Sequence, residues 1–239
     1  MSSSNIHKKG FVPEPPQGCD LSRDRILLHC CCAPCSTAII EWMVNQGLRP
    51  GIFFSNSNIV PFHEYAVRRD ELRRYAIAHG LETIDDEYDH SAWLAFVRQL
   101  EPPIRIADMP ERGPRCLECF KFRLLSAARY ASTHGYRLLT TTLASSRWKD
   151  LAQVDAAGRW ACETINGKAT GDASLSVASV PSTIAVSPAA DRSPEASAEV
   201  LWWNQNWRRG GLQERRNALI KEWSMYNQTF CGCEFSERH

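Results

Sequence analysis

Cysteines are the residues of this sequence with the clearest capacity for chemistry. Segment 29–35 reads His-Cys-Cys-Cys-Ala-Pro-Cys, and segment 116–119 supplies a separate Cys-x-x-Cys. Soft thiolates suit zinc or iron–sulfur clusters, and two sulfurs of one Cys-x-x-Cys can bind a single metal centre. Cys30 alone is typical of a buried strand residue, because free cysteine often packs as a small hydrophobe. The pattern predicts a metal site that involves Cys31, Cys32, Cys116 and Cys119.

The spacing of these cysteines leaves the metal open. A four-cysteine zinc site would combine Cys32 and Cys35 with Cys116 and Cys119. Zinc and iron–sulfur clusters accept the same thiolate ligands at similar spacings. Both metals therefore stay as alternatives at this point.

A third group, Cys231-Gly232-Cys233, stands near the end of the sequence. Cysteines two residues apart can be bridged only in a small, strained ring, and strain makes a disulfide easier to reduce. Glycine between them supplies the backbone freedom that such a ring needs. The group is a candidate redox-active disulfide, although a Cys-x-Cys can also form half of a metal site.

Composition indicates a reduced compartment. The chain has 239 residues, 44% of them hydrophobic, which is enough for a sizeable core. It contains no apolar run near the ~20 residues that span a bilayer, and residues 1–20 show no secretory signal, so we expect a cytoplasmic protein without a membrane partner. Ten cysteines in a reducing compartment favour metal binding or redox catalysis over a disulfide framework. The net charge of +1 does not indicate a nucleic-acid binder, so any such role must come from local patches.

The elements that must position these cysteines alternate between strand and helix. Apolar runs predict strands at 26–30, 51–54, 81–84 and 136–141. Helices are expected after Pro34, after Pro61, around Trp93–Leu100, and through Cys119 to about Gly135. This alternation is typical of an α/β fold with a parallel sheet covered by helices on both faces.

In such sheets, ligands bind beyond the carboxyl ends of the strands, at the topological switch point. The cysteines at 30–35 follow the first predicted strand, and Thr140–Ser146 follow the fourth. We therefore expect both groups at one crevice.

Four segments are predicted along the chain. Residues 1–24 are interpreted as a mobile leader, 25–166 as the α/β catalytic core, and 200–239 as a C-terminal helical segment with the Cys-x-Cys tail. Residues 167–199 are rich in Ala, Ser and Pro and lack aromatic side chains, which favours a disordered low-complexity insertion. Deleting 170–197 should leave the chemistry nearly unchanged, because loop length alters closure entropy only slowly.

Read together, these segments resemble the QueH family of epoxyqueuosine reductases. The resemblance rests on segments 28–36, 53–59, 115–124 and 140–149, on Glu64, Tyr65 and Arg68, and on the tail 226–236. It covers about residues 25–165 and 200–236 in order, so it is far more specific than a lone Cys-x-x-Cys. The family pattern leads us to expect an aromatic pair or Gln-Tyr at positions 229 and 230. The Thr229-Phe230 found there is a minor departure from that pattern.

The resemblance implies a Rossmann-like, HUP-like fold and the reduction of epoxyqueuosine to queuosine at the wobble position of tRNAs with GUN anticodons. It implies a [4Fe-4S] cluster on Cys31, Cys32, Cys116 and Cys119, no cobalamin, and a redox-active disulfide between Cys231 and Cys233. An additional iron and the identity of the electron donor stay open.

The HUP-like fold is shared with ATP-using tRNA-modifying enzymes, so an ATP pyrophosphatase has to be considered. Those enzymes bind phosphate on a glycine-rich loop after the first strand. Here that loop contains no glycine, which disfavours ATP use.

Basic and titratable residues are the candidates for contacts with the substrate. Candidate proton donors are His29, Tyr65 and Lys149. Arginines recur on the helix after Pro61 and near Trp207, and bases in single-stranded loops stack on aromatic rings and arginine planes. The predicted tRNA contacts are Arg68, Arg69, Lys149, Arg208 and Arg209.

Two readings other than a reductase remain open. One is a zinc-stabilised RNA-binding module. The other is a thiol–disulfide oxidoreductase that uses Cys32 with Cys35 or Cys231 with Cys233. Metal content and visible absorbance of anaerobically purified protein would separate the three.

Overall fold

The structure, a computed structural model, describes residues 13–168 and 199–236. The elements are β1 Ile26–Cys30, α1 Ala33–Asn45, β2 Gly51–Phe54, α2 Phe62–Ala78, β3 Thr83–Asp85, α3 His90–Arg98, η1 Ile106–Asp108, α4 Pro114–Thr133, β4 Leu138–Thr141, η2 Thr142–Ser145, α5 Leu151–Ile165, β5 Leu201–Trp202 and α6 Leu212–Glu222.

The strands form one parallel sheet in the order β3-β2-β1-β4-β5. In the middle of the sheet, Leu28 of β1 pairs with Ile52 on one side and Thr140 on the other. The chain builds outward from β1 in one direction through β2 and β3, and then in the other through β4 and β5. The order therefore reverses between β1 and β4, and the ends of these two strands define the switch point.

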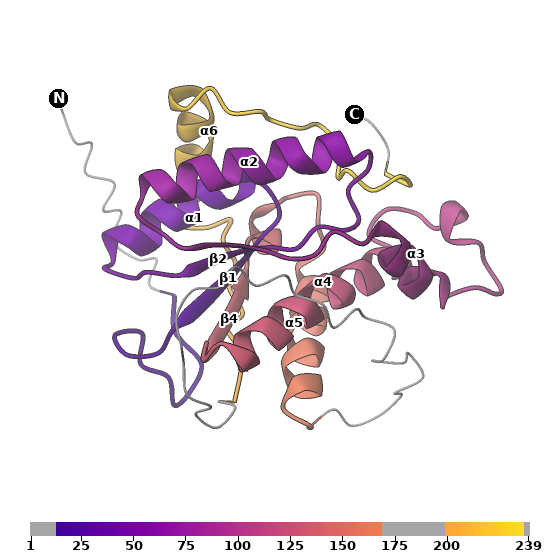
Figure 1. The fold of residues 1–239 in the computed structure, drawn as a ribbon, viewed down its shortest axis with the longest axis horizontal. Coiled ribbons are helices and arrows are strands. Elements are labelled where there is room, and N and C mark those ends of the chain that lie inside the picture. The colour runs from indigo at the N-terminus through magenta and orange to yellow at the C-terminus, as the bar shows by residue number, and fades with distance from the viewer. Residues whose placement is uncertain (1–12, 169–198, 237–239) are drawn as a thin grey trace.

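Helices cover both faces of the sheet (Figure 1). Helices α1, α2 and α6 pack together on one face, and α4 and α5 pack together on the other, where α3 contacts α4. Pro34 lies in the first turn of α1, where a missing N–H costs nothing, and Gly47 follows the helix with φ +78°. Covering both faces explains why β1, β2 and β4 are buried along their whole length, since no side of them faces water.

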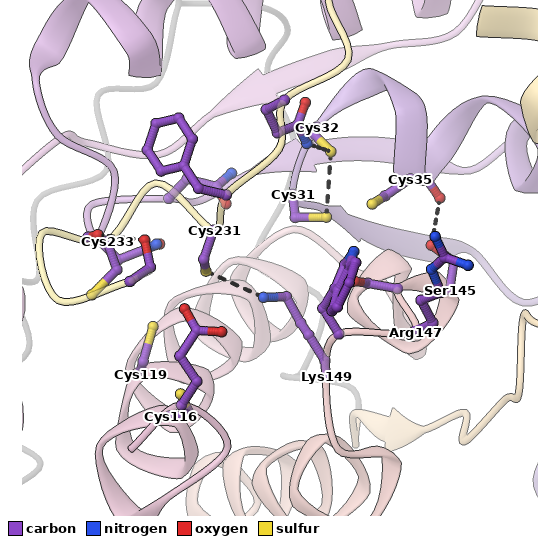
Figure 2. Close-up of a pocket in the computed structure, with 18 of the residues that line it drawn as sticks. Cys31, Cys32, Cys35, Cys116, Cys119, Ser145, Arg147, Lys149, Cys231 and Cys233 are labelled. Carbon is purple, nitrogen blue, oxygen red and sulfur yellow. Dashed lines mark hydrogen bonds between the residues drawn. The ribbon is translucent and has the colours of Figure 1, made fainter. Parts of the chain in front are cut away.

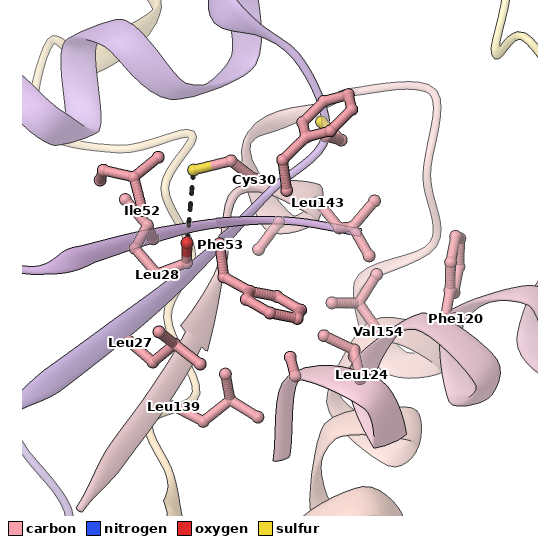
Figure 3. Close-up of a cluster of buried hydrophobic side chains, with 14 of the residues drawn as sticks. Leu27, Leu28, Cys30, Ile52, Phe53, Phe120, Leu124, Leu139, Leu143 and Val154 are labelled. Atoms are coloured by element: carbon pink, nitrogen blue, oxygen red, sulfur yellow. Dashed lines mark hydrogen bonds between the residues drawn. The ribbon is translucent and has the colours of Figure 1, made fainter. Parts of the chain in front are cut away.

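One part of the core lies between the sheet and the α4–α5 pair (Figure 3). Leu27 and Leu139 from the strands meet Leu124 of α4 and Val154 of α5, and all four are buried. Phe53 of β2 is fully buried and stacks obliquely on Tyr130, 5.1 Å between ring centroids. Burying a large apolar side chain contributes about 1.5–3 kcal/mol. This packing fixes α4, and with it Cys116 and Cys119, against the sheet.

The α/β fold with a parallel sheet is confirmed, with local corrections. The third strand is Thr83–Asp85 rather than 81–84, and the fourth begins at Leu138. Leu100, expected on the third helix, lies beyond its end at Arg98 and packs against the core from the following turn.

One α-helix and one strand were not predicted, α5 and β5, nor were the short 3-10 helices η1 and η2. Asp150 caps α5 by accepting hydrogen bonds from the N–H groups of Ala152 and Gln153. Val154, Ala157 and Ala161 then follow at helical spacing and are buried. This cap-and-spacing signal is present in the sequence. Strand β5 is only two residues long, too short for a periodic pattern to reveal.

Most of the predicted insertion, and residues 1–12 of the predicted leader, lie outside the described residues. Residues 13–24 form no helix or strand, but they lie against the core, where Trp203 Nε1 donates to the Glu14 carbonyl at 2.8 Å. The four-segment division stays a prediction. No helix among residues 13–168 and 199–236 is long and apolar enough to cross a membrane.

Candidate active site

A cavity of about 560 Å³ opens at the carboxyl edge of the sheet, at the switch point between β1 and β4. Seven of the ten cysteines line it, contributed by the β1–α1 junction, helix α4 and the C-terminal tail: Cys31, Cys32, Cys35, Cys116, Cys119, Cys231 and Cys233 (Figure 2). Its size is in the range of small-ligand sites. The expectation that the loops after the first and fourth strands meet at one crevice is confirmed.

The β1–α1 junction is tied directly to the end of β4. The Cys31 N–H donates to Thr142 Oγ1 at 3.2 Å, and Ser36 Oγ lies 3.2 Å from the same oxygen. The Ser145 hydroxyl donates to the Cys35 carbonyl at 2.9 Å. Hydroxyl side chains after β4 therefore hold the cysteine loop in place.

The sulfur atoms of Cys31, Cys32 and Cys35 lie within 4.8 Å of one another. Cys31 Sγ and Cys32 Sγ are 3.8 Å apart. Hydrogen bonds from Cys32 and Cys35 lower the pKa of Cys31, while the pKa of Cys32 is raised. Of these two thiols, Cys31 therefore loses its proton more readily. Among residues 13–168 and 199–236 this is the only set of three or more His, Cys, Asp or Glu side chains with such closely spaced ligand atoms.

Cys116 and Cys119 face the cavity from the first turns of α4 (Figure 2). They line the same space but do not belong to the close sulfur group of the β1–α1 junction. Burial raises the pKa of Cys116 to about 11, and the neighbouring Cys119 adds to this. The predicted ligands therefore lie on two walls of one cavity, and Cys35, absent from the predicted cluster set, joins the first wall.

The Cys231–Cys233 tail reaches the cavity through long-range contacts. Buried Arg68 on α2 pairs with Glu64 at 2.6 Å and donates to the carbonyls of Cys231 at 2.8 Å and Phe230 at 3.3 Å. Gly232 has φ +97°, and its carbonyl accepts from the Val60 N–H at 2.9 Å. Cys231 and Cys233 are free thiols in this structure.

Two cations, the half-buried Lys149 and the buried Arg123, set the electrostatics of the cavity. Lys149 Nζ donates to Cys231 Sγ at 3.3 Å (Figure 2). Arg123 is fully buried and donates through Nε to the Ser55 carbonyl at 3.0 Å and through a terminal nitrogen to Asn56 Oδ1. Burial alone would raise the pKa of Cys231, but Lys149 and then Arg123 outweigh it, and the pKa is lowered. The site therefore favours a thiolate at Cys231.

The donor set fits a soft metal centre. Five thiols on two walls of one cavity match the ligands of iron–sulfur clusters and of zinc. Neither the close sulfur group nor the cavity volume distinguishes the two.

Comparison with known proteins decides the family. A sequence model described as "Epoxyqueuosine reductase QueH" matches residues 26–170 and 166–239. A protein of that name from Histophilus somni is 34% identical over 90% of this chain and 73% of its own length. The protein of that name from Acinetobacter baylyi is 32% identical over 90% of this chain and 81% of its own length. The one from Thermotoga maritima is 27% identical over 88% of this chain and 89% of its own length. The chain belongs to the epoxyqueuosine reductase QueH family.

For this QueH-family chain, the candidate proton donors separate clearly. His29 is fully buried and outside the cavity lining. Its Nε2 lies 3.1 Å from the Ser55 carbonyl and its Nδ1 2.7 Å from Thr141 Oγ1. Burial, reinforced by Arg123, lowers its pKa to about 3, so the ring is neutral and structural. Tyr65 is also buried outside the lining. Of the three candidates, Lys149 alone lines the cavity.

The predicted tRNA contacts also occupy different places. Arg68 is 3% exposed and holds the tail, so it is not the surface cation that we expected. Arg69 pairs with Asp70 at 2.8 Å, on a face away from the cavity lining. Arg208 lines the cavity and donates to the carbonyls of Ser146 and Lys149. Arg209 is exposed but does not line it.

From the sequence, Arg123 received no role, although it lies in the matched segment 115–124, and Arg68 was taken for a tRNA contact rather than for the anchor of the tail. The spacing of arginines on a helix does not show which of them is buried. Cys35 was visible as part of the cysteine-rich loop but was assigned only to the zinc and the thiol–disulfide oxidoreductase alternatives. Cys19 and Cys162 belong to none of the cysteine motifs and lie outside the cavity lining. Cys162 is buried in α5, and burial raises its pKa to about 12.

Proposed function

We propose that this chain reduces epoxyqueuosine to queuosine at the wobble position of tRNAs with GUN anticodons. Membership of the QueH family supports the reaction. The observation that carries it is the convergence of seven cysteines on one cavity at the switch point of a parallel sheet. A cytoplasmic location goes with the proposal, because reduced thiols persist there.

A [4Fe-4S] cluster is proposed on the facing walls of the cavity, with Cys31 and Cys32 on one and Cys116 and Cys119 on the other. Their softness as ligands and their common cavity support this set. When bound, such a cluster supplies the electron transfers that organic side chains do not provide. Cys35, whose sulfur is close to those of Cys31 and Cys32, is the rival ligand.

The reaction needs two electrons and two protons. Converting an epoxide to an alkene breaks both C–O bonds and releases the oxygen as water. Oxidation of two thiols to a disulfide releases two electrons and two protons, so the reduced pair Cys231–Cys233 balances one turnover. An external reductant must then restore the two thiols. Lys149, whose pKa is raised chiefly by the thiolate of Cys231 against the opposing effect of burial, holds a proton in the cavity.

The activity is tested by incubating anaerobically reconstituted protein with tRNA that carries epoxyqueuosine. Nucleoside mass spectrometry should show loss of one oxygen at the wobble nucleoside and formation of queuosine. Absence of conversion with both a chemical and an enzymatic reductant would overturn the proposal.

The cofactor is tested separately from activity. Anaerobic protein should be brown, with broad visible absorbance that dithionite bleaches. A colourless protein with stoichiometric zinc would favour an RNA-binding module, and a colourless metal-free protein a thiol–disulfide oxidoreductase.

The ligand set is tested by comparing C35S with C116S and C119S. If Cys31, Cys32, Cys116 and Cys119 are the ligands, C116S and C119S should lose the cluster, and C35S should retain iron and visible absorbance. The reverse pattern would assign the cluster to the β1–α1 junction alone.

A further inference from the structure

Positive charge is concentrated at the cavity. Although the chain carries a net charge of only +1, eight arginine or lysine side chains line the cavity against two carboxylates, those of Glu111 and Asp150. Arg112 and Arg208 direct their guanidinium groups at backbone carbonyls, which leaves their charge in place. A local field of this sign suits a polyanion, whatever the charge of the whole chain.

An exposed tryptophan stands in this field. Trp148 is 54% exposed and lines the cavity in the loop between η2 and α5. It precedes Lys149, whose amine contacts Cys231. The guanidinium carbon of Arg147 lies 5.3 Å from the Trp148 ring centroid. Single exposed hydrophobic residues are common on protein surfaces. This one differs because it is part of the wall of the candidate active site.

The loop that carries Trp148 is held rigidly. Four successive carbonyls, those of residues 146–149, each accept a hydrogen bond from an arginine. Arg208 donates to the first and last of these carbonyls, those of residues 146 and 149. Arg112 donates to the two between them, those of Arg147 at 3.2 Å and Trp148 at 3.1 Å. Gln153 in turn donates to the Arg112 carbonyl at 2.7 Å. Two arginines and one glutamine thus fix the backbone under the exposed ring, which reduces the ordering cost of stacking on it.

The size of the cavity decides what the ring can meet. A volume of about 560 Å³ accommodates one nucleoside, whereas the proposed substrate is a tRNA. Nucleotides on either side of the reacting one must therefore lie on the rim. Proteins bind unpaired bases by stacking them on aromatic rings and neutralising the adjoining phosphates with arginine or lysine. Trp148 and Arg147 supply both groups on one rim.

We propose that Trp148 is a stacking platform for an unpaired nucleobase adjacent to the modified nucleoside, with Arg147 contacting a neighbouring phosphate. The proposal rests on the proposed function, because it takes the reacting nucleoside to enter the cavity from an RNA loop. It adds a binding site for the flanking nucleotide that the cysteine chemistry does not require.

The test measures binding of full-length, anaerobically prepared protein to two RNA probes. One is an anticodon stem-loop with G at the wobble position, and the other has abasic sites on both sides of that G. W148A should weaken binding of the intact probe by roughly 5- to 100-fold, the range for loss of one stacked base. The abasic probe should bind W148A and wild type equally, and W148F should retain most of the affinity.

Phe62 supplies the matched control, since it is also 54% exposed and lies outside the cavity lining. F62A should bind both probes as wild type does. R147A should reduce the slope of log affinity against log salt by about one, and W148A should leave the slope unchanged.

Two results would overturn the inference. One is an unchanged affinity of W148A for the intact probe. The other is an equal loss for both probes, which would make the ring structural. In either case conversion of epoxyqueuosine by wild type still supports the proposed function, whereas wild-type protein that neither binds the intact probe nor converts the tRNA defeats both proposals.

Discussion

The two ends of the chain bring cysteines to the same cavity in different ways. At the β1–α1 junction, Cys31 and Cys32 follow a fully buried strand and precede a helix. The Cys31 N–H donates to Thr142 at the end of the neighbouring strand β4, which anchors the junction. The tail pair, Cys231 and Cys233, follows α6 by several residues without regular structure. It is placed by Arg68 and by one backbone hydrogen bond from Val60. The first group is built into the core, and the second is docked onto it.

This difference suits different roles. A rigid junction keeps several sulfurs close together at little entropic cost, which is what a permanent metal site needs. A docked tail can move when a few contacts break, which is what a pair that alternates between dithiol and disulfide needs. Substitutions can therefore be chosen that affect one group and spare the other.

The largest effect is expected at the junction. C31S should abolish metal binding and turnover together, because it removes from the close sulfur group the thiol whose pKa its neighbours lower. C30A is the matched control, since Cys30 is buried in β1 outside the cavity lining. It should cost about 1 kcal/mol of stability and keep the metal. Iron analysis and urea unfolding check both, and metal retained in C31S would contradict the assignment.

Loosening the tail should separate activity from metal content. R68M leaves two tail carbonyls without a donor, a loss of about 1–3 kcal/mol for each in tail docking, and also removes the partner of Glu64 within α2. Hydrogen exchange in residues 226–236 should rise, turnover should fall at least tenfold, and iron should be unchanged. R69M, which removes a partly exposed ion pair with Asp70, should keep tail hydrogen exchange, turnover and iron content within twofold of wild type. Loss of iron in R68M would mean that the tail helps to hold the metal.

A smaller tail effect is expected at Gly232. Alanine there would keep an unfavourable φ of +97°, and its Cβ would lie 3.1 Å from Ile59 Cγ1 and from Arg68. We expect a cost of about 1–3 kcal/mol, confined to the tail. G232A should slow disulfide formation between Cys231 and Cys233 in mass-spectrometric trapping. G18A, at a positive-φ glycine with open space around it, should leave trapping at the wild-type rate.

The smallest effect is electrostatic. Lys149 and Arg123 lower the pKa of Cys231 below its ordinary 9.0 against the effect of burial. The thiolate therefore adds stability that is present above pH 9 and is lost as the pH falls through the lowered folded pKa. K149M should move the midpoint of Cys231 alkylation to higher pH. Each pH unit by which the midpoint rises should slow the reaction at neutral pH about tenfold, because less thiolate is present. K149R should keep the low midpoint, and an unmoved midpoint in K149M would exclude Lys149 as the cause.

Much of the fold was predictable because its signals are local. The buried run Ile26–Cys30, the proline in the next turn and Gly47 after it are read from adjacent residues, and each predicts the element that the structure contains. The same holds for the meeting of the loops after β1 and β4, since carboxyl ends of parallel strands share one edge. Helix α5 was missed although its cap and its spacing were present.

The sequence by itself determined which residues could do chemistry, because thiols, their clustering and their order along the chain do not depend on the fold. Tertiary structure decided which of them meet. Only packing brings Cys231 of the tail beside Lys149, turns Arg68 from an expected surface cation into the anchor of the tail, and removes His29 from the cavity. The physical reason is that burial and long-range contact depend on elements far apart in sequence, whose juxtaposition no local pattern records.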